Sequence, residues 1–127
     1  MSKILKIRAR QVFDSRGNPT IEAEVYSRYL SASAICPSGA STGAYEAYEK
    51  RDKSNKKYLG KSVFGAVNIV NTKILKKLKG QNIHDQERID TILINLDGTK
   101  EKSNLGANAI LAVSIAVKKL SAKIKKL

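Results

Sequence analysis

The chain has 127 residues, of which 42% are hydrophobic and 28% are charged, a composition typical of one globular domain with its own core. Its single cysteine excludes an internal disulfide and a paired-cysteine metal site, and its first residues lack the apolar core of a signal peptide. We therefore expect a cytoplasmic protein that does not enter a membrane. The net charge of +13 keeps nucleic acid among the partners to be considered.

The first third of the chain alternates between apolar and polar residues, which is the pattern of half-buried strands. Residues 4–12 alternate in this way, and the turn-forming residues 14–19 follow them. Residues 21–26 and 29–36 predict a second and a third strand, with Cys36 on the buried face as an inert thiol. Because the links are short, we expect an antiparallel meander of three strands. The inward positions of the first strand would be Leu5, Ile7 and Ala9.

Farther along the chain, the apolar residues recur with a helical period. We expect a first helix from a cap at Ser62 to a stop at Gly80, and a second from near Asp85 to Gly98. A third helix begins near Leu105, and its first half is apolar on nearly every side, so it should be the most buried. Three strands followed by helices predict an α+β fold, with the helices packed on one face of the sheet.

A run of small and turn-forming residues separates the last strand from the first helix. Residues 36–47 read CPSGASTGAYEA, and Gly43 is followed by alanine rather than by the lysine of a Walker phosphate loop. The glycines permit unusual backbone angles, and the hydroxyl and carbonyl oxygens suit Mg²⁺, although carboxylates from elsewhere would be needed to hold the ion. From the residues alone, a mobile lid and a plain surface loop are equally open.

The other chemistry-bearing side chains favour structural roles. His84 is the only histidine and lies in a polar linker, so a role at a helix start or on the surface is favoured over catalysis, which needs a positioned partner. Glu46 and Glu49 lie three residues apart beside Lys50 and Arg51. This grouping favours a surface salt-bridge cluster over acid–base catalysis.

Eight short motifs follow one another along the chain. They are Asp14-Ser15-Arg16-Gly17-Asn18-Pro19-Thr20, Pro37-Ser38-Gly39-Ala40-Ser41-Thr42-Gly43, Glu46-Ala47, Arg51-Asp52, Tyr58-Leu59-Gly60-Lys61-Ser62-Val63, Ala66-Val67-Asn68, Leu96-Asp97-Gly98-Thr99 and Leu105-Gly106-Ala107-Asn108-Ala109-Ile110-Leu111. This series resembles the amino-terminal domain of enolase, the glycolytic phosphopyruvate hydratase, over about residues 4–122. The resemblance implies that residues 1–127 are an enolase amino-terminal (lid) domain, and that the catalytic α/β barrel is absent from this chain.

The resemblance also implies a role for the run of small residues. In enolases the matching loop closes over the bound substrate, and Ser41 would supply oxygen ligands to Mg²⁺. The complete enzyme, a lyase, would dehydrate 2-phosphoglycerate to phosphoenolpyruvate. The barrel would supply the catalytic residues and the other magnesium ligands, so the isolated chain should be inactive. In a homodimer, Arg10 and Glu22 would contact the barrel of the partner subunit. The lid residues would be Ser38, Gly39, Ala40, Ser41, Thr42 and Gly43.

Two other functions stay open at this point. A strongly basic domain without a barrel could be a non-catalytic module that binds nucleic acid or another polyanion, and salt would then weaken binding steeply. Alternatively, the chain is a degenerate fragment, whose barrel-facing surface would be an exposed apolar patch.

Overall fold

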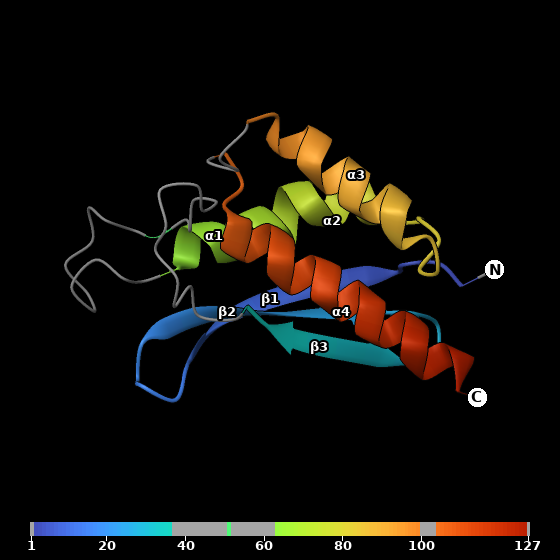
Figure 1. Ribbon diagram of the computed structural model, residues 1–127, viewed down its shortest axis with the longest axis horizontal. Helices are drawn as coiled ribbons and strands as arrows, with labels where there is room; N and C mark the ends of the chain where they lie inside the picture. Colours follow the sequence, from blue (N-terminus) through green and yellow to red (C-terminus); the bar gives the residue numbers. More distant parts are fainter. Residues whose placement is uncertain (1, 37–50, 52–62, 100–103, 127) are drawn as a thin grey trace.

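A three-stranded sheet forms one layer of the fold. The computed structural model describes residues 2–36, 51, 63–99 and 104–126. The strands pair antiparallel in the order β1-β2-β3, which confirms the predicted meander. Figure 1 shows the helices on one side of this sheet. The strands are β1 (Lys6–Phe13), β2 (Pro19–Tyr26) and β3 (Ser31–Ile35).

Helices form the second layer. The first helical segment is continuous but changes type along its length, from α1 (Phe64–Ile69) through the π-helical turn η2 (Val70–Ile74) to α2 (Leu75–Leu78). It is followed by α3 (Gln86–Asp97) and α4 (Ala107–Lys125). Helix α4 packs on β2 and β3, whereas α1 and η2 contact β1. The predicted α+β fold, with helices on one face of the sheet, is confirmed.

The ends of α3 follow the sequence signals. The Asp85 carboxylate accepts a hydrogen bond from the Arg88 backbone N–H at 3.2 Å, and Gly98 ends the helix with a left-handed φ of 73°. The predicted cap of the first helix was wrong, because the capping position is Val63, which makes no side-chain capping bond. The predicted Ser62 lies outside the described residues.

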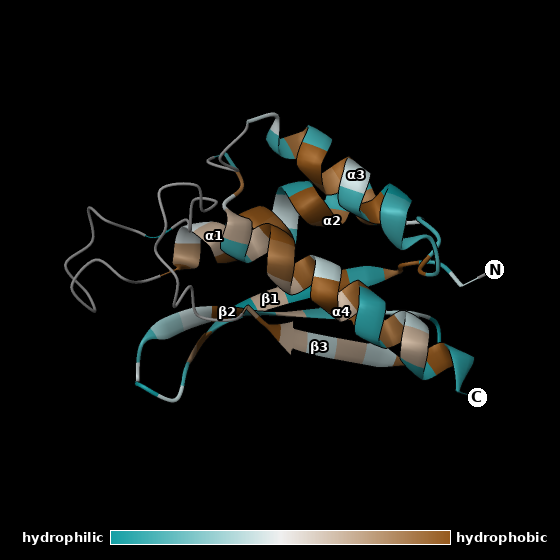
Figure 2. Ribbon diagram, in the orientation of Figure 1, coloured by the Kyte–Doolittle hydropathy of each residue, from teal (hydrophilic) through white to brown (hydrophobic). Residues whose placement is uncertain are grey.

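The core lies between the sheet and the helices, and Figure 2 shows apolar residues in both layers. Helix α4 is the most buried helix, as predicted, with eight of its 19 residues buried. Strands β1 and β2 bury mainly alternate residues against the helical layer, as alternation along a strand predicts, and Thr20 at the start of β2 is an additional buried residue. The buried residues of these two strands are Ile7, Ala9, Pro19, Thr20, Ile21, Ala23 and Val25.

The predicted inward position of Leu5 was wrong, since this side chain is 49% exposed. The reason is that β1 begins only at Lys6, so strand alternation does not extend back to Leu5. Ile4 is fully buried instead, because its backbone N–H donates to the Gln81 carbonyl at 3.0 Å and its carbonyl accepts from the Gly80 N–H at 2.8 Å. These two bonds turn the chain start toward the loop before α3.

Asn71, in the π-helical turn η2, binds the backbone of β1 through its side-chain amide. Its Oδ1 accepts from the Ala9 N–H at 2.7 Å, and its Nδ2 donates to the Ala9 carbonyl at 3.2 Å. One side chain therefore satisfies both backbone groups that Ala9 turns away from β2. Single π-helical turns often occur where a helix makes a specific contact, and this one lies where η2 meets β1.

The buried carboxylate of Asp97 ties the end of α3 to the start of α4. Asp97 is 1% exposed. Its Oδ1 accepts from the Thr99 backbone N–H at 2.9 Å and from the Thr99 hydroxyl, and its Oδ2 accepts from the Leu105 N–H at 2.7 Å. The Asn104 side chain also donates to the Asp97 carbonyl at 2.6 Å. A buried carboxylate is tolerated here because hydrogen-bond donors surround it.

Asp97→Asn should destabilise the chain, because the new amide group would face backbone N–H donors and leave buried donors without an acceptor. We expect the free energy of unfolding in urea to fall by about 2 kcal/mol. The matched control is Asp85→Asn, where asparagine caps a helix almost as well as aspartate, so the loss should be about 0.5 kcal/mol or less. Equal losses in the two variants would contradict the role assigned to the Asp97 carboxylate.

Candidate functional site

The region that the sequence singles out for function leaves the sheet directly after β3. Cys36 is the last described residue before it, and both the N–H and the carbonyl of this residue are hydrogen-bonded. Its N–H donates to the Ile21 carbonyl at 2.9 Å, and its carbonyl accepts from the Thr20 hydroxyl at 3.2 Å. Cys36 is 3% exposed, which agrees with its interpretation as a buried thiol. The backbone of Cys36, after which the chain leaves the sheet, is therefore held in place.

Two further contacts fasten the same region to the same end of the β1–β2 hairpin. The Arg51 Nη1 donates to the Pro19 carbonyl at 2.9 Å, and the Val63 N–H donates to the Gln11 Oε1 at 2.9 Å. Pro19 pairs with the last residue of β1 in the strand register. Positions 36, 51 and 63 are thus all attached near the end of one hairpin.

The turn between β1 and β2 is locked by the side chain of Asp14. Its Oδ1 accepts from the N–H groups of Arg16 and Asn18, both at 2.9 Å, and Gly17 adopts a positive φ of 79°. The hydrogen bond from Asn18 is the main reason that the pKa of Asp14 lies below its ordinary value, with smaller contributions from the charges of Arg16 and Arg51. The hairpin end that receives the three attachments is therefore well ordered.

All six predicted lid residues, Ser38 to Gly43, lie outside the described residues, and so does the predicted metal ligand Ser41. The structure also does not describe Glu46, Glu49 or Lys50. Arg51, which we assigned to a surface salt-bridge cluster, is half-buried and binds a backbone carbonyl. The structure thus describes the base of the predicted lid and leaves the lid geometry untested.

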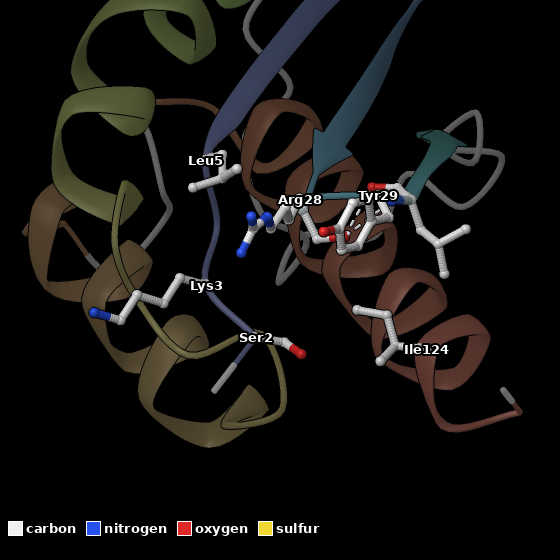
Figure 3. A pocket seen from close by; sticks show the side chains of 8 residues that line it. Ser2, Lys3, Leu5, Arg28, Tyr29 and Ile124 are labelled. Carbon is white, nitrogen blue, oxygen red and sulfur yellow. Dashed lines mark hydrogen bonds between the residues drawn. The ribbon is translucent and has the colours of Figure 1, made fainter.

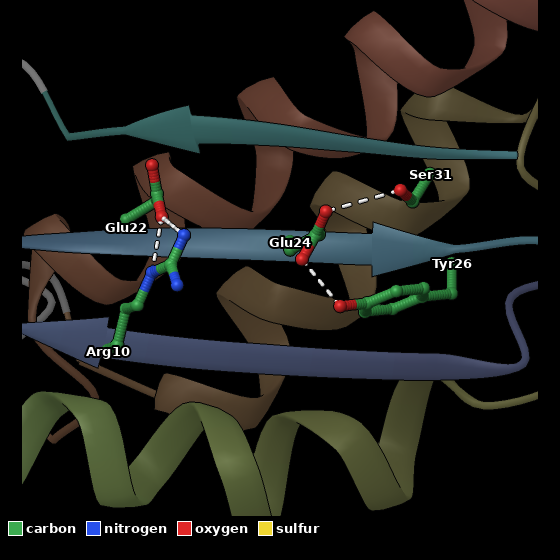
Figure 4. Close-up of polar contacts among 5 residues, drawn as sticks. All are labelled: Arg10, Glu22, Glu24, Tyr26 and Ser31. Carbon is green, nitrogen blue, oxygen red and sulfur yellow. Dashed lines mark hydrogen bonds and ion pairs between the residues drawn. The ribbon is translucent and has the colours of Figure 1, made fainter.

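The predicted dimer-contact residues lie on the face of the sheet that points away from the helices (Figure 4). Arg10 and Glu22 are opposite each other in the β1–β2 register, and their side chains form an ion pair at 2.6 Å. The hydrogen bond and charge of Glu22 raise the pKa of Arg10. Because the Arg10 side chain is 65% exposed, the pair adds little stability by itself. Their contact with a second subunit stays a prediction.

A second polar cluster lies beside this ion pair on the same face of the sheet (Figure 4). The Tyr26 hydroxyl donates to the Glu24 Oε1 at 2.5 Å, and the Ser31 hydroxyl donates to the Glu24 Oε2 at 3.2 Å. The hydrogen bond from Tyr26 is the main cause of the lowered pKa of Glu24, and the pKa of Tyr26 is raised in turn. The Lys6 ammonium lies 5.7 Å from the centre of the Tyr26 ring.

The remaining candidates occupy structural positions. His84 is half-buried, and its Nδ1 lies 2.7 Å from the Ser121 hydroxyl, which joins the loop before α3 to α4. Within the described residues there is no group of three or more His, Cys, Asp or Glu side chains that could hold a metal ion. None of the described helices is long and apolar enough to cross a membrane.

An open pocket lies at the opposite end of the hairpin from the three attachments (Figure 3). The start of the chain, the β2–β3 turn and the end of α4 line this pocket, which has a volume of about 510 Å³. Tyr29 is 83% exposed, and the Arg28 guanidinium carbon lies 5.3 Å from the centre of its ring. The described lining residues include no carboxylate or histidine, so the pocket offers no acid–base pair. The lining side chains include Lys3, Leu5, Arg28, Tyr29, Leu30 and Ile124.

Comparison with protein families matches residues 4–127 to the amino-terminal domain of enolase. The enolase of Pelagibacter ubique (strain HTCC1062) is 85% identical to the chain over 125 residues. The matched region covers 98% of this chain but 30% of that relative. The chain therefore spans less than half of the length of the relative that it resembles so closely.

Glu24 should contribute to the acid sensitivity of the chain. Since its pKa in the folded state lies below its value of about 4.3 in the unfolded chain, the ionised carboxylate adds stability above that pH. This stability is lost as the pH falls through the folded-state pKa. We expect Glu24→Gln to reduce the drop in unfolding free energy between about pH 6 and about pH 3, measured with urea at each pH.

The matched variant for this measurement is Tyr26→Phe, which removes the hydroxyl that donates to Glu24. This variant should also reduce the drop in unfolding free energy. If both variants show the same dependence as the unaltered chain, the contact between Tyr26 and Glu24 does not stabilise the ionised carboxylate.

Proposed function

The chain belongs to the enolase family as its amino-terminal domain, and on this premise we propose that residues 38–43 form a lid over the active site of the complete enzyme. The complete enzyme would be a lyase that dehydrates 2-phosphoglycerate to phosphoenolpyruvate in glycolysis. The observation that carries this proposal is the 85% identity to a named enolase across 98% of the chain. The barrel domain, joined to this chain or bound to it, would hold the catalytic residues.

The attachments at the end of the β1–β2 hairpin support this role. A lid that closes on a substrate needs a fixed base, because closure must bring its residues to a defined position. The buried Cys36, which immediately precedes the proposed lid, is bound to Thr20 and Ile21. The contact between Val63 and Gln11 fixes the chain again where α1 begins. The described structure therefore offers such a base.

In this proposal only the complete enzyme binds Mg²⁺. The described residues do not form a metal site, and a single serine cannot hold Mg²⁺, which prefers several oxygen ligands in octahedral geometry. Ser41 would add its carbonyl and hydroxyl oxygens to an ion held mainly by carboxylates of the barrel. What this chain would contribute is the lid and the exclusion of water from the closed site.

The outer face of the sheet is the part that would meet a second subunit in a homodimer. Arg10 and Glu22 already form an ion pair with each other. Charged groups of a partner would therefore bind to this ion pair and not to two unpaired charges. A partner that buried the pair would lower the local dielectric and strengthen its interaction with those added charges.

The proposal is tested with a chimaera in which this chain replaces the matching 125 residues of the Pelagibacter ubique enolase. We expect the chimaera to form phosphoenolpyruvate with Mg²⁺ present, measured by ultraviolet absorbance, whereas the isolated chain forms none. Ser41→Ala should raise the Mg²⁺ concentration for half-maximal rate about tenfold, which is the effect of losing about 1.4 kcal/mol of binding.

The control variant is Thr91→Ala, which removes an exposed hydroxyl from α3 and should leave the Mg²⁺ requirement unchanged. An inactive chimaera would refute the proposed function. Activity of the isolated chain would refute the need for a barrel. An active chimaera with an unchanged Mg²⁺ requirement in Ser41→Ala would refute the metal-binding role of Ser41 alone.

The second candidate function, polyanion binding, has one observation in its favour. The carboxyl-terminal half of α4 presents several exposed cations, and charge of this kind attracts nucleic acid without sequence preference. We expect any binding of a duplex DNA to weaken steeply as the salt concentration rises. The DNA binding of unrelated lysine-rich proteins should weaken to the same extent. Binding that is tighter than theirs at the same salt concentration would favour this function. The exposed cations are Lys118, Lys119, Lys123 and Lys125 in α4, and Lys126 directly after it.

A further inference from the structure

The pocket beside the β2–β3 turn is formed by three segments that lie far apart in the sequence. The start of the chain forms one side, the turn forms the second, and the last turn of α4 forms the third. Figure 3 shows Leu5 at the chain start, Arg28 and Tyr29 on the turn, and Ile124 on α4 around this pocket. Its volume of about 510 Å³ lies within the range of about 300–1,000 Å³ that is usual for small-molecule sites.

Hydrogen bonds hold the three sides of the pocket together. The Leu5 N–H donates to the Tyr26 carbonyl at 2.9 Å, which fastens the start of the chain to the end of β2. The Lys123 Nζ donates to the Ser31 carbonyl at 2.9 Å, which ties the end of α4 to the start of β3. The pocket is therefore largely formed without a ligand, and binding would not have to order its walls.

The pocket combines an apolar wall with positive charge. Leu5, Leu30 and Ile124 supply the apolar wall, and Leu5 is 49% exposed in spite of its large hydrophobic side chain. Lys3 and Arg28 are the charged residues of the described lining, and none of the described lining residues is acidic. A ligand that carries both an apolar group and a negative charge would therefore match this lining.

The position of Arg28 suits the binding of a carboxylate. Its guanidinium carbon lies 5.3 Å from the centre of the Tyr29 ring, which is within the range of a favourable cation–π contact. A guanidinium that lies over a ring still presents N–H donors at its edge, and these donors match the two oxygens of a carboxylate. Tyr29 is 83% exposed, so a large aromatic surface beside these donors is open to a ligand.

The backbone around the pocket favours a small molecule over a peptide. A peptide that binds in an extended conformation gains affinity from main-chain hydrogen bonds to its receptor. Here the N–H groups of Leu5 and Ser27 already donate to the carbonyls of Tyr26 and Leu30. The Leu30 N–H donates to the Ser27 hydroxyl at 3.2 Å. These backbone groups are therefore not available to an incoming peptide.

We propose that this pocket binds a small organic acid, whose apolar ring or chain lies against the apolar wall and whose carboxylate pairs with Arg28. Lys3 adds a second positive charge on the side of the chain start. The proposal goes beyond the proposed function of the chain and does not involve the lid, because described residues alone form this site.

The test measures the binding of 2-naphthoate to the isotope-labelled chain by two-dimensional NMR, with naphthalene-2-carboxamide as a neutral analogue of the same shape. We expect 2-naphthoate to bind about fivefold more tightly than the amide, which is the effect of one charged contact at a partly exposed site. The changes in chemical shift should centre on residues 2–5, 27–30 and 124. The chimaera with the Pelagibacter ubique enolase should show the same selectivity.

Three variants separate the charge of Arg28 from the net charge and from the apolar wall. Arg28→Gln should weaken the binding of 2-naphthoate about fivefold and leave that of the amide within about twofold. The matched control is Arg16→Gln, which removes an exposed arginine from the β1–β2 turn and should leave both affinities within about twofold. Leu5→Ala should weaken both ligands about fivefold, because it removes part of the apolar wall. All three positions are exposed, so the variants should keep the fold.

Several results would overturn the proposal. Equal affinities for 2-naphthoate and the amide would contradict the role of the carboxylate, and equal losses from Arg28→Gln and Arg16→Gln would assign the binding to net charge. Shift changes centred elsewhere, or none at about 10 mM 2-naphthoate, would exclude this pocket as the site. Tighter binding of an acetylated tripeptide with phenylalanine between two aspartates would show that the pocket takes a peptide instead. Loss of binding in the chimaera would exclude the site from the complete enzyme.

Discussion

The close packing of α4 on the sheet is the contact on which the rest of the fold depends. Helix α4 lies close to β2 and β3, and several of its buried residues are alanines, whose small side chains allow a close approach of backbones. Ala109, Ala112 and Ala116 are all fully buried. Larger side chains at these buried positions would push the two layers apart.

The sequence was sufficient for the parts of the fold that local chemistry decides. Alternation predicted the three strands, and the pair of Asp85 and Gly98 predicted both ends of α3, because capping depends on residues within one turn of the helix end. Leu5 shows the limit of this reasoning. The alternation of β1 extends to Leu5 in the sequence, but the hydrogen bonds between Ile4 and residues 80 and 81 decide where the chain runs.

Contacts between distant residues account for what the sequence did not predict. Gln11 binds Val63, Asn71 binds Ala9, and Arg51 binds Pro19, over separations of 52, 62 and 32 positions. No periodic pattern marks a glutamine, asparagine or arginine that will bind the backbone of another element. Motif resemblance did mark Arg51 and the turn before Pro19, but only the structure shows that the two meet. The lid residues themselves depend on resemblance alone.

The amide of Asn71 has a consequence for how other molecules can approach the sheet. A strand at the edge of a sheet can accept an additional strand from a peptide or a second chain through its unpaired backbone groups. At Ala9 both of these groups are already bound to Asn71. An incoming strand would have to displace this side chain and separate η2 from β1. Recognition by strand addition is therefore disfavoured along the middle of β1.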